Sequence, residues 1–82
     1  MEKSIFTPEQ KVFEQLLREY RTEAGLTQGQ LAERLATLQT IVSNIEIGER
    51  RLDILELRQV CKALGVTLRD FVDKLEDRLD SL

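Results

Sequence analysis

The sequence predicts an all-α protein, and three observations lead to this prediction. Apolar residues recur at spacings of three and four along most of the 82 residues, which is the period of an amphipathic helix. The single proline and three of the four glycines lie where a helix would begin or end. Runs of β-branched residues, which are typical of strands, are scarce. These patterns divide the chain into five helical segments.

Length and composition restrict the classes of protein that fit. Residues 1–82 suffice for one domain with a small core, and 41% apolar with 33% charged residues is ordinary for a soluble globular protein. The one cysteine excludes an intramolecular disulfide and suits a cytoplasmic protein. No apolar run approaches the roughly 18 residues of a membrane span, so we expect no membrane partner. The chain also starts without the apolar block of a secretory signal.

The first predicted helix follows a loose lead-in over residues 1–6. Thr7 can cap this helix, Pro8 fits its first position, and Gln10 can complete a capping box. Gly25 ends it, because glycine adopts the left-handed cap conformation freely. Its inner stripe is Val12, Phe13, Leu16, Leu17 and Tyr20, and its outward residues are Lys11, Glu14, Arg18 and Glu19.

The stretch from Thr27 to Gly48 predicts two short helices that cross at a tight turn. Thr27 and Gln30 form a capping box for the first, which extends to about Leu35. Only residues 36–38 remain for the turn, where Ala36 is a poor choice if the backbone is left-handed. We expect Thr37 rather than Leu38 to cap the next helix, since leucine is a weak cap. Apolar residues at Leu31, Ala32, Leu35, Val42 and Ile45 face inward.

Two short crossed helices form a helix-turn-helix, whose second helix can enter the DNA major groove. Four residues of that second helix, spaced at i, i+1, i+4 and i+5, share the face opposite its apolar stripe and carry no acid. Glutamine and asparagine can pair with adenine, and the threonine methyl can meet that of thymine. A neutral solvated surface is the alternative interpretation. The four residues are Gln39, Thr40, Ser43 and Asn44.

Two further helices follow a loop over residues 49–52. Asp53 and Glu56 begin the fourth helix, and Gly65 ends it. Its stripe is Leu57, Val60, Cys61 and Leu64, with a partial contribution from Leu55; Cys61 is expected to be a buried, inert thiol. Thr67 and Asp70 begin the C-terminal helix within residues 66–82, whose single apolar face is Leu68, Phe71, Val72, Leu75, Leu79 and Leu82.

The end of this apolar face has two interpretations. Leu75, Leu79 and Leu82 either pack on the first helix or form the seam of a homodimer, since exposed leucines at this spacing need a partner. The acidic residues on the same helix have the spacing of a solvated face: Asp70, Asp73, Asp77 and Asp80.

The segments GLTQGQLAERLA at 25–36, QTIVSNIEIGERRLDILEL at 39–57 and ALG at 63–65 resemble the phage-repressor helix-turn-helix family, of the Cro and XRE-like repressor type. The resemblance covers residues 17–71 and implies a compact five-helix bundle that binds double-stranded operator DNA as a dimer. Relatives of this type also act in restriction control and as antitoxins. Three positions depart from the family pattern: Ala36 replaces a glycine, Leu38 a serine or threonine, and Ile47 a residue that is often polar.

The resemblance also implies residue roles. Gln39, Thr40 and Asn44 match residues that contact bases, while Gln28 matches a glutamine that contacts phosphate and braces the recognition helix; Thr40 and Asn44 can equally match phosphate contacts. Ser43, which lies on the same face but is not part of this match, is predicted to contact phosphate. Arg21 and Glu46 match an arginine and a glutamate that pair between the first and third helices.

Charge is the main objection to a DNA-binding protein, because the net charge is −3 where a basic footprint is usual. Arg50 and Arg51 follow the recognition helix and could clamp phosphates, or they could be solvated loop residues. With Arg21 and Arg34 they could form a local positive rim.

The functional prediction is a cytoplasmic, dimeric, sequence-specific repressor, and the alternative is an antitoxin-like or adaptor module that binds protein. One domain of a longer regulator is a third possibility. The chain lacks histidine, a cysteine pair and a phosphate loop, so no enzyme activity, metal or cofactor is expected. The residues point to no particular small-molecule effector.

Overall fold

The computed structural model describes residues 7–82, which fold into five helices, and the all-α prediction is confirmed. The expected lead-in over residues 1–6 lies outside the described residues. The helices are α1 (Pro8–Glu23), α2 (Gln28–Arg34), α3 (Gln39–Glu46), α4 (Ile54–Leu64) and α5 (Leu68–Asp80).

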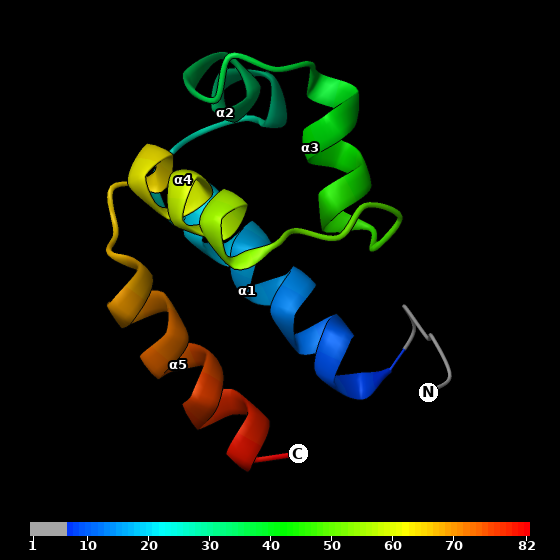
Figure 1. The fold of residues 1–82 in the computed structure, drawn as a ribbon, viewed down its shortest axis with the longest axis vertical. Coiled ribbons are helices and arrows are strands. Elements are labelled where there is room, and N and C mark those ends of the chain that lie inside the picture. The colour runs from blue at the N-terminus through cyan, green and yellow to red at the C-terminus, as the bar shows by residue number, and fades with distance from the viewer. Residues whose placement is uncertain (1–6) are drawn as a thin grey trace.

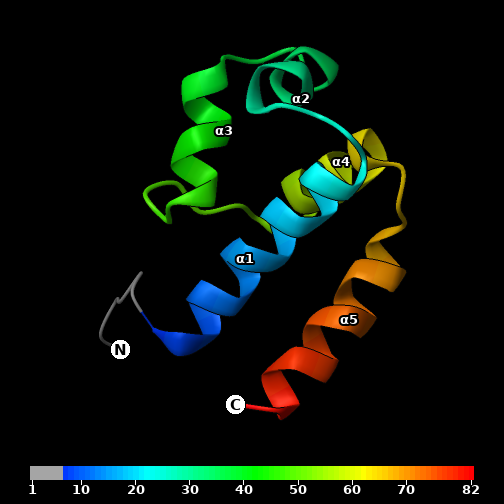
Figure 2. The ribbon, with the colours of Figure 1, turned by 180° about the vertical axis from the view of Figure 1, so that it is seen from behind.

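The five helices form two groups. The short helices α2 and α3 lie together at one end of the molecule, and α1 and α5 run side by side in opposite directions (Figure 1). The reverse view shows the same pairing (Figure 2), and α4 contacts both α2 and α5. Helix α1 contacts both α3 and α5, so it joins the two groups. One core lies between them: Leu16, Leu17, Leu26, Leu31, Ala32, Val42, Ile45, Leu57, Val60, Cys61, Leu64 and Phe71.

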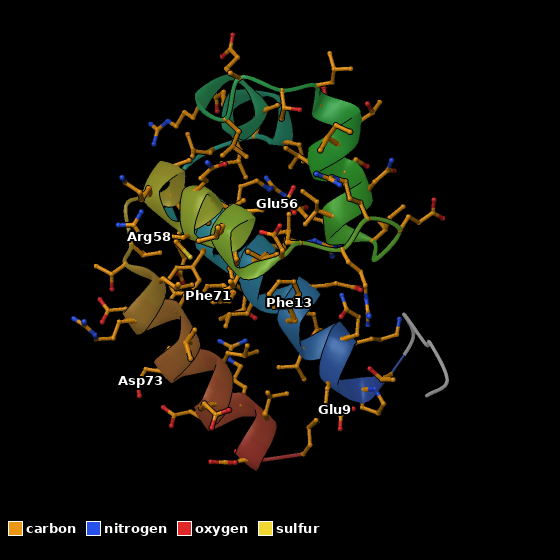
Figure 3. All side chains as sticks on the ribbon, in the orientation of Figure 1. Glu9, Phe13, Glu56, Arg58, Phe71 and Asp73 are labelled. Carbon is orange, nitrogen blue, oxygen red and sulfur yellow. The ribbon has the colours of Figure 1, made fainter. Side chains whose placement is uncertain are left out.

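Helix α5 covers an aromatic face of α1. The fully buried ring of Phe71 lies edge-on to Phe13, with centroids 5.9 Å apart, and 5.6 Å from the ring of Tyr20. Phe13 and Phe71 occupy the space between the two helices (Figure 3). Arg78 then donates to both carboxylate oxygens of Glu19, at 2.8 and 2.6 Å, and this hydrogen bonding lowers the pKa of Glu19. Aromatic packing and an ion pair therefore hold α5 against α1.

Side-chain caps fix the start of four helices. Thr27 with Gln30 and Asp53 with Glu56 form complete capping boxes, as the sequence predicts. Thr67 accepts from the Asp70 amide at the start of α5. The box expected at α1 is only half formed. Thr7 accepts from the Gln10 amide, but the Gln10 side chain donates to Glu14 instead.

The cap predicted for α3 was wrong by one residue. Leu38 is the N-cap and makes no side-chain cap bond, because Thr37 already belongs to the end of α2. The Thr37 amide donates to the Ala32 carbonyl and the Ala36 amide to that of Glu33, which together close a Schellman motif. This motif requires a left-handed residue, and Ala36 supplies it with φ of 55°.

The burial of Glu14 and Leu55 differs from the prediction. Glu14, expected outside, is 8% exposed, because it packs on Gly48, where the chain has no side chain to exclude it. Leu55, expected to contribute partly to the stripe of α4, is 71% exposed, because the core-facing positions of the helix begin at Leu57.

Candidate nucleic-acid interface

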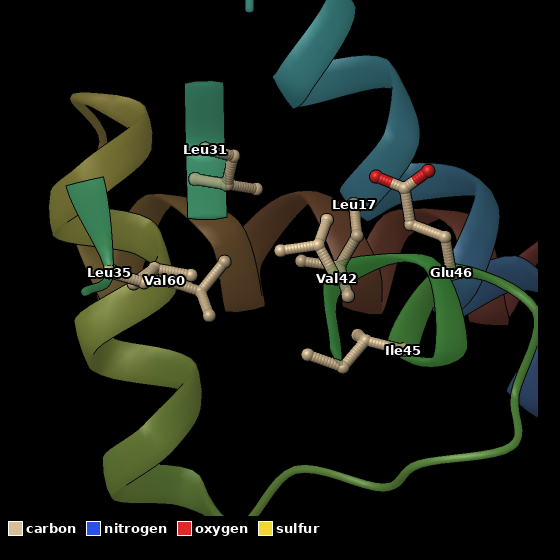
Figure 4. A pocket seen from close by; sticks show the side chains of 7 residues that line it. All are labelled: Leu17, Leu31, Leu35, Val42, Ile45, Glu46 and Val60. Atoms are coloured by element: carbon tan, nitrogen blue, oxygen red, sulfur yellow. The ribbon is translucent and has the colours of Figure 1, made fainter. Parts of the chain in front are cut away.

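The inner face of α3 is fixed by apolar packing. Val42 and Ile45 meet side chains from α1, α2 and α4, and the cavity left between them has a volume of only about 10 Å³. Figure 4 shows these side chains converging, with the Glu46 carboxylate turned away from them. Close packing on this face determines which side of α3 points outward. The lining residues are Leu17, Leu31, Leu35, Val42, Ile45, Glu46 and Val60.

The outward face of α3 holds the predicted reading residues. Gln39 and Thr40 are exposed, and Ser43 and Asn44 are half-buried. A Cβ built on Gly29 would lie 3.6 Å from Gln39 Oε1, so the Gln39 side chain rests against the first turn of α2. The amides and hydroxyls are thus held by two packed helices that leave the first turn of α3 open to solvent.

The C-terminal end of α3 is held by a buried ionic cluster. Arg21 Nε donates to Glu46 Oε2 at 2.6 Å, and Arg21 Nη2 to Glu46 Oε1 at 3.1 Å. Gln28 Nε2 donates to the same Oε1 at 3.0 Å, and Arg18 Nε lies 3.6 Å away. The Glu46 side chain is 3% exposed and that of Arg21 is 12% exposed. A carboxylate from α3 therefore binds donors from both α1 and α2.

The cluster determines the charge state of Glu46. Burial alone would raise the pKa of this carboxyl, but hydrogen bonds from Arg21 and Gln28, with the charges of Arg21 and Arg18, outweigh burial and lower it. Arg21 Nη1 also donates to the Leu26 carbonyl at 2.8 Å. Across residues 7–82, every buried side-chain nitrogen and oxygen has a hydrogen-bond partner.

A second contact with α1 fixes the loop after α3. Gly48 has φ of 84°, and a Cβ at this position would overlap the carboxylate of Glu14. The Asn44 carbonyl accepts from the amides of Glu49 and Arg50, at 2.8 and 3.1 Å. Sequence reasoning missed Glu14, because a glutamate inside an amphipathic helix gives no sign that it will be buried.

The comparisons with known proteins agree with this geometry. The profile of a family described as "Helix-turn-helix" matches residues 17–71, which run from the middle of α1 into α5. The chain belongs to this family. A solved structure described as an XRE-family like protein from Pseudomonas syringae pv. tomato str. DC3000 is 38% identical, with 85% of each chain covered and a TM-score of 0.80. Among curated proteins no significant match was found.

The XRE-type helix-turn-helix family is a family of DNA-binding regulators, and α3, the second helix of the helix-turn-helix, is the candidate recognition helix of this chain. The structure brings Arg21 and Glu46 together, as the resemblance implied. It also places Gln28 as a brace on that pair. One N–H of the Gln28 amide is engaged by Glu46, and the amide group has a second N–H for another acceptor.

The expected positive rim of this helix-turn-helix is smaller than the sequence suggested. Arg21 points inward to Glu46, so its charge does not serve an outer rim. Arg34 donates to the Ala63 carbonyl at 2.9 Å. Arg50 Nη2 lies 2.9 Å from Glu56 Oε2, and both side chains are partly exposed. Arg51 is exposed in the same loop.

The three leucines considered for a dimer seam differ in their surroundings. Leu75 packs against the core and Leu79 is half-buried, whereas Leu82 is exposed. Packing within the chain thus accounts for Leu75. Cys61 is fully buried, and burial raises the pKa of its thiol to about 11. Across residues 7–82 no helix combines the length and apolar character that a membrane crossing requires.

Proposed function

We propose that this chain is a sequence-specific transcriptional repressor that binds a palindromic operator as a homodimer. Gln39, Thr40 and Asn44 would contact base edges, and Gln28, Ser43, Arg50 and Arg51 would contact phosphates. The observation that supports this proposal is the exposed, uncharged first turn of α3, held in place by packing on its other face. An uncharged helix surface that offers amides and hydroxyls suits direct base reading.

Dimerisation follows from the small size of one reading surface. A helix of eight residues is about 12 Å long and reaches only a few base pairs. Two recognition helices about 34 Å apart would read half-sites one helical turn apart. Of the three leucines considered for a dimer seam, Leu82 is the most exposed. Light scattering should give the mass of a dimer for the full chain and of a monomer for Leu82→Glu if this residue forms the seam.

The test of the proposed function is selection of binding sites from a random duplex library by the full chain. A two-fold symmetric consensus supports the proposal, and affinity measurements with Gln39→Ala should then show a loss of roughly 1–3 kcal/mol at one position of each half-site. A Gln39→Ala consensus identical to that of the unchanged chain would remove Gln39 from base contact. Failure to enrich any sequence would contradict sequence-specific binding.

The proposed phosphate contacts can be tested by the salt dependence of DNA affinity. Each phosphate contact contributes about 0.9 to the salt slope of affinity, and replacing Arg50 and Arg51 by alanine removes four such contacts from a dimer, so the slope should fall by roughly three to four. Arg69→Ala is the matched control, because Arg69 is an exposed arginine on α5, away from α3. An unchanged slope in the double variant would exclude both arginines from phosphate contact.

A protein-interaction module, as in antitoxins or adaptors, is the second candidate function. The net charge of −3 and the pairing of Arg50 with Glu56 favour it, because both weaken the field that attracts phosphates. Equal affinity for selected and scrambled duplexes at two salt concentrations would favour this second candidate.

A further inference from the structure

The part of the helix-turn-helix that would face DNA carries only some of the side-chain types that read bases. Residues 35–45 contain no charged residue, although the chain as a whole is 33% charged. Arginine and lysine are the side chains that most often read guanine, through O6 and N7. Amides pair with adenine N6 and N7, and apolar groups contact the thymine methyl. The recognition helix therefore offers groups that suit A·T pairs and lacks those that usually read G·C pairs.

Leu38 adds an apolar group at the edge of this surface. Its side chain is 70% exposed, and it immediately precedes the exposed Gln39 and Thr40. It occupies the N-cap of α3 without making a cap bond, where serine or threonine would stabilise the helix. Neither packing nor capping within the chain explains a leucine here. Its position at the N-terminus of the recognition helix is the one from which side chains reach base edges.

We propose that the chain reads A·T pairs at the point where α3 enters the groove, with Leu38 against a thymine methyl and the Gln39 amide on an adenine. This inference rests on the proposed function. From Leu38 to Asn44 the helix rises about 9 Å, which corresponds to roughly three base pairs. The half-site therefore contains A·T pairs facing Leu38 and Gln39, at one end of the stretch of base pairs that α3 spans.

The experiment uses the site selected by the full chain and measures affinity by fluorescence anisotropy. Each thymine is replaced in turn by deoxyuridine, which lacks only the C5 methyl. One position per half-site should weaken binding about fourfold, the equivalent of about 0.8 kcal/mol for one methyl group. Leu38→Ala should abolish this sensitivity. A matching scan with 7-deazaadenine should weaken binding by the unchanged chain but not by Gln39→Ala.

Two control variants separate Leu38 from other apolar groups. Leu55→Ala removes an equally exposed leucine from α4, and Thr40→Ser removes the neighbouring methyl but keeps the hydroxyl. Both should retain the fourfold sensitivity to deoxyuridine. Loss of sensitivity in Thr40→Ser, or its persistence in Leu38→Ala, would overturn the role of Leu38.

The outcomes also distinguish this inference from the proposed function. A selected site that is bound specifically but has G·C pairs at these positions, or tolerates every deoxyuridine, overturns only the A·T inference. Failure to bind any duplex specifically overturns both. A selected A·T pair with Leu38-dependent methyl sensitivity supports both.

Discussion

The two ends of α3 contrast sharply in how they are held. At the C-terminal end, Glu46 accepts from Arg21 and Gln28, and Glu14 packs against Gly48. At the N-terminal end the cap residue Leu38 makes no side-chain bond and the first turn is exposed. Charge is concentrated in the buried end and is absent from the exposed end.

This contrast shows how an eight-residue helix can be both fixed and accessible. Isolated helices of this length are marginal in water, so tertiary contacts must supply the stability of α3. Concentrating those contacts at the C-terminal end and on the inner face leaves Gln39 and Thr40, in the N-terminal turn, exposed to solvent. The identity of these exposed side chains is therefore not fixed by packing, and they can serve binding.

The largest expected effect is that of removing the charge from the buried cluster. Glu46→Gln should lower the free energy of unfolding by about 3–5 kcal/mol, because it leaves the buried Arg21 without a compensating charge. Urea denaturation measures this loss. The exposed Glu49→Gln, three residues away, is the matched control and should change stability by less than about 0.5 kcal/mol. A loss under 1 kcal/mol in Glu46→Gln would mean that apolar packing alone holds this end.

The second effect is steric. Gly48→Ala should cost about 2–4 kcal/mol, from left-handed strain and from overlap with the Glu14 carboxylate. In a Glu14→Ala background only the strain remains, so the cost should fall by about half. A double-mutant cycle from urea denaturation measures the difference. Strict additivity of the two substitutions would exclude the contact as a constraint on the loop.

The third effect is acid sensitivity, which is smaller at moderate pH because only the protonated fraction of Glu46 loses its charge. The folded-state pKa of Glu46 is lowered from 4.5, so its contribution to stability is complete above that pH. The contribution is lost as the pH falls through the lowered pKa. Carboxyl NMR titration of the folded chain should therefore place the midpoint of Glu46 below that of exposed glutamates. A midpoint at or above 4.5 would show that burial outweighs the hydrogen bonds.

The smallest effect is at the exposed end and has the opposite sign. Leu38→Ser should raise the free energy of unfolding by about 0.5–1 kcal/mol, because serine can cap α3 where leucine cannot. Thermal denaturation measures the gain. If Leu38 reads thymine as inferred, the more stable variant should also lose its sensitivity to deoxyuridine. A decrease in stability would indicate that Leu38 packs within the chain after all.

Sequence reasoning succeeded where the signal is local. The capping boxes at Thr27 and Asp53 and the left-handed ends at Gly25 and Gly65 depend on residues within one turn of each other. Helix bounds and most of the core could therefore be predicted. The cap of α3 could not be predicted, because Thr37 could either cap α3 or close the C-terminal end of α2, and its amide closes α2.

Tertiary partners were harder to predict. Spacing gives no indication that Arg21 and Glu46, 25 residues apart, would meet, and only the family resemblance implied it. The burial of Glu14 depends on the absence of a side chain at Gly48, a relation that no helical periodicity encodes. The open face of α3 was predictable in composition, but Leu38 was noted only as a poor cap.

The packing of Phe71 has a consequence for how the protein is made. Synthesis proceeds from the N-terminus, so the ribosome completes the whole helix-turn-helix before it adds α5. Until then Phe13 and Tyr20 have no aromatic partner from α5, and Glu19 has no Arg78. A nascent chain at this stage leaves the aromatic face of α1 without its cover from α5, and exposed apolar surface of this kind promotes aggregation until the last helix packs.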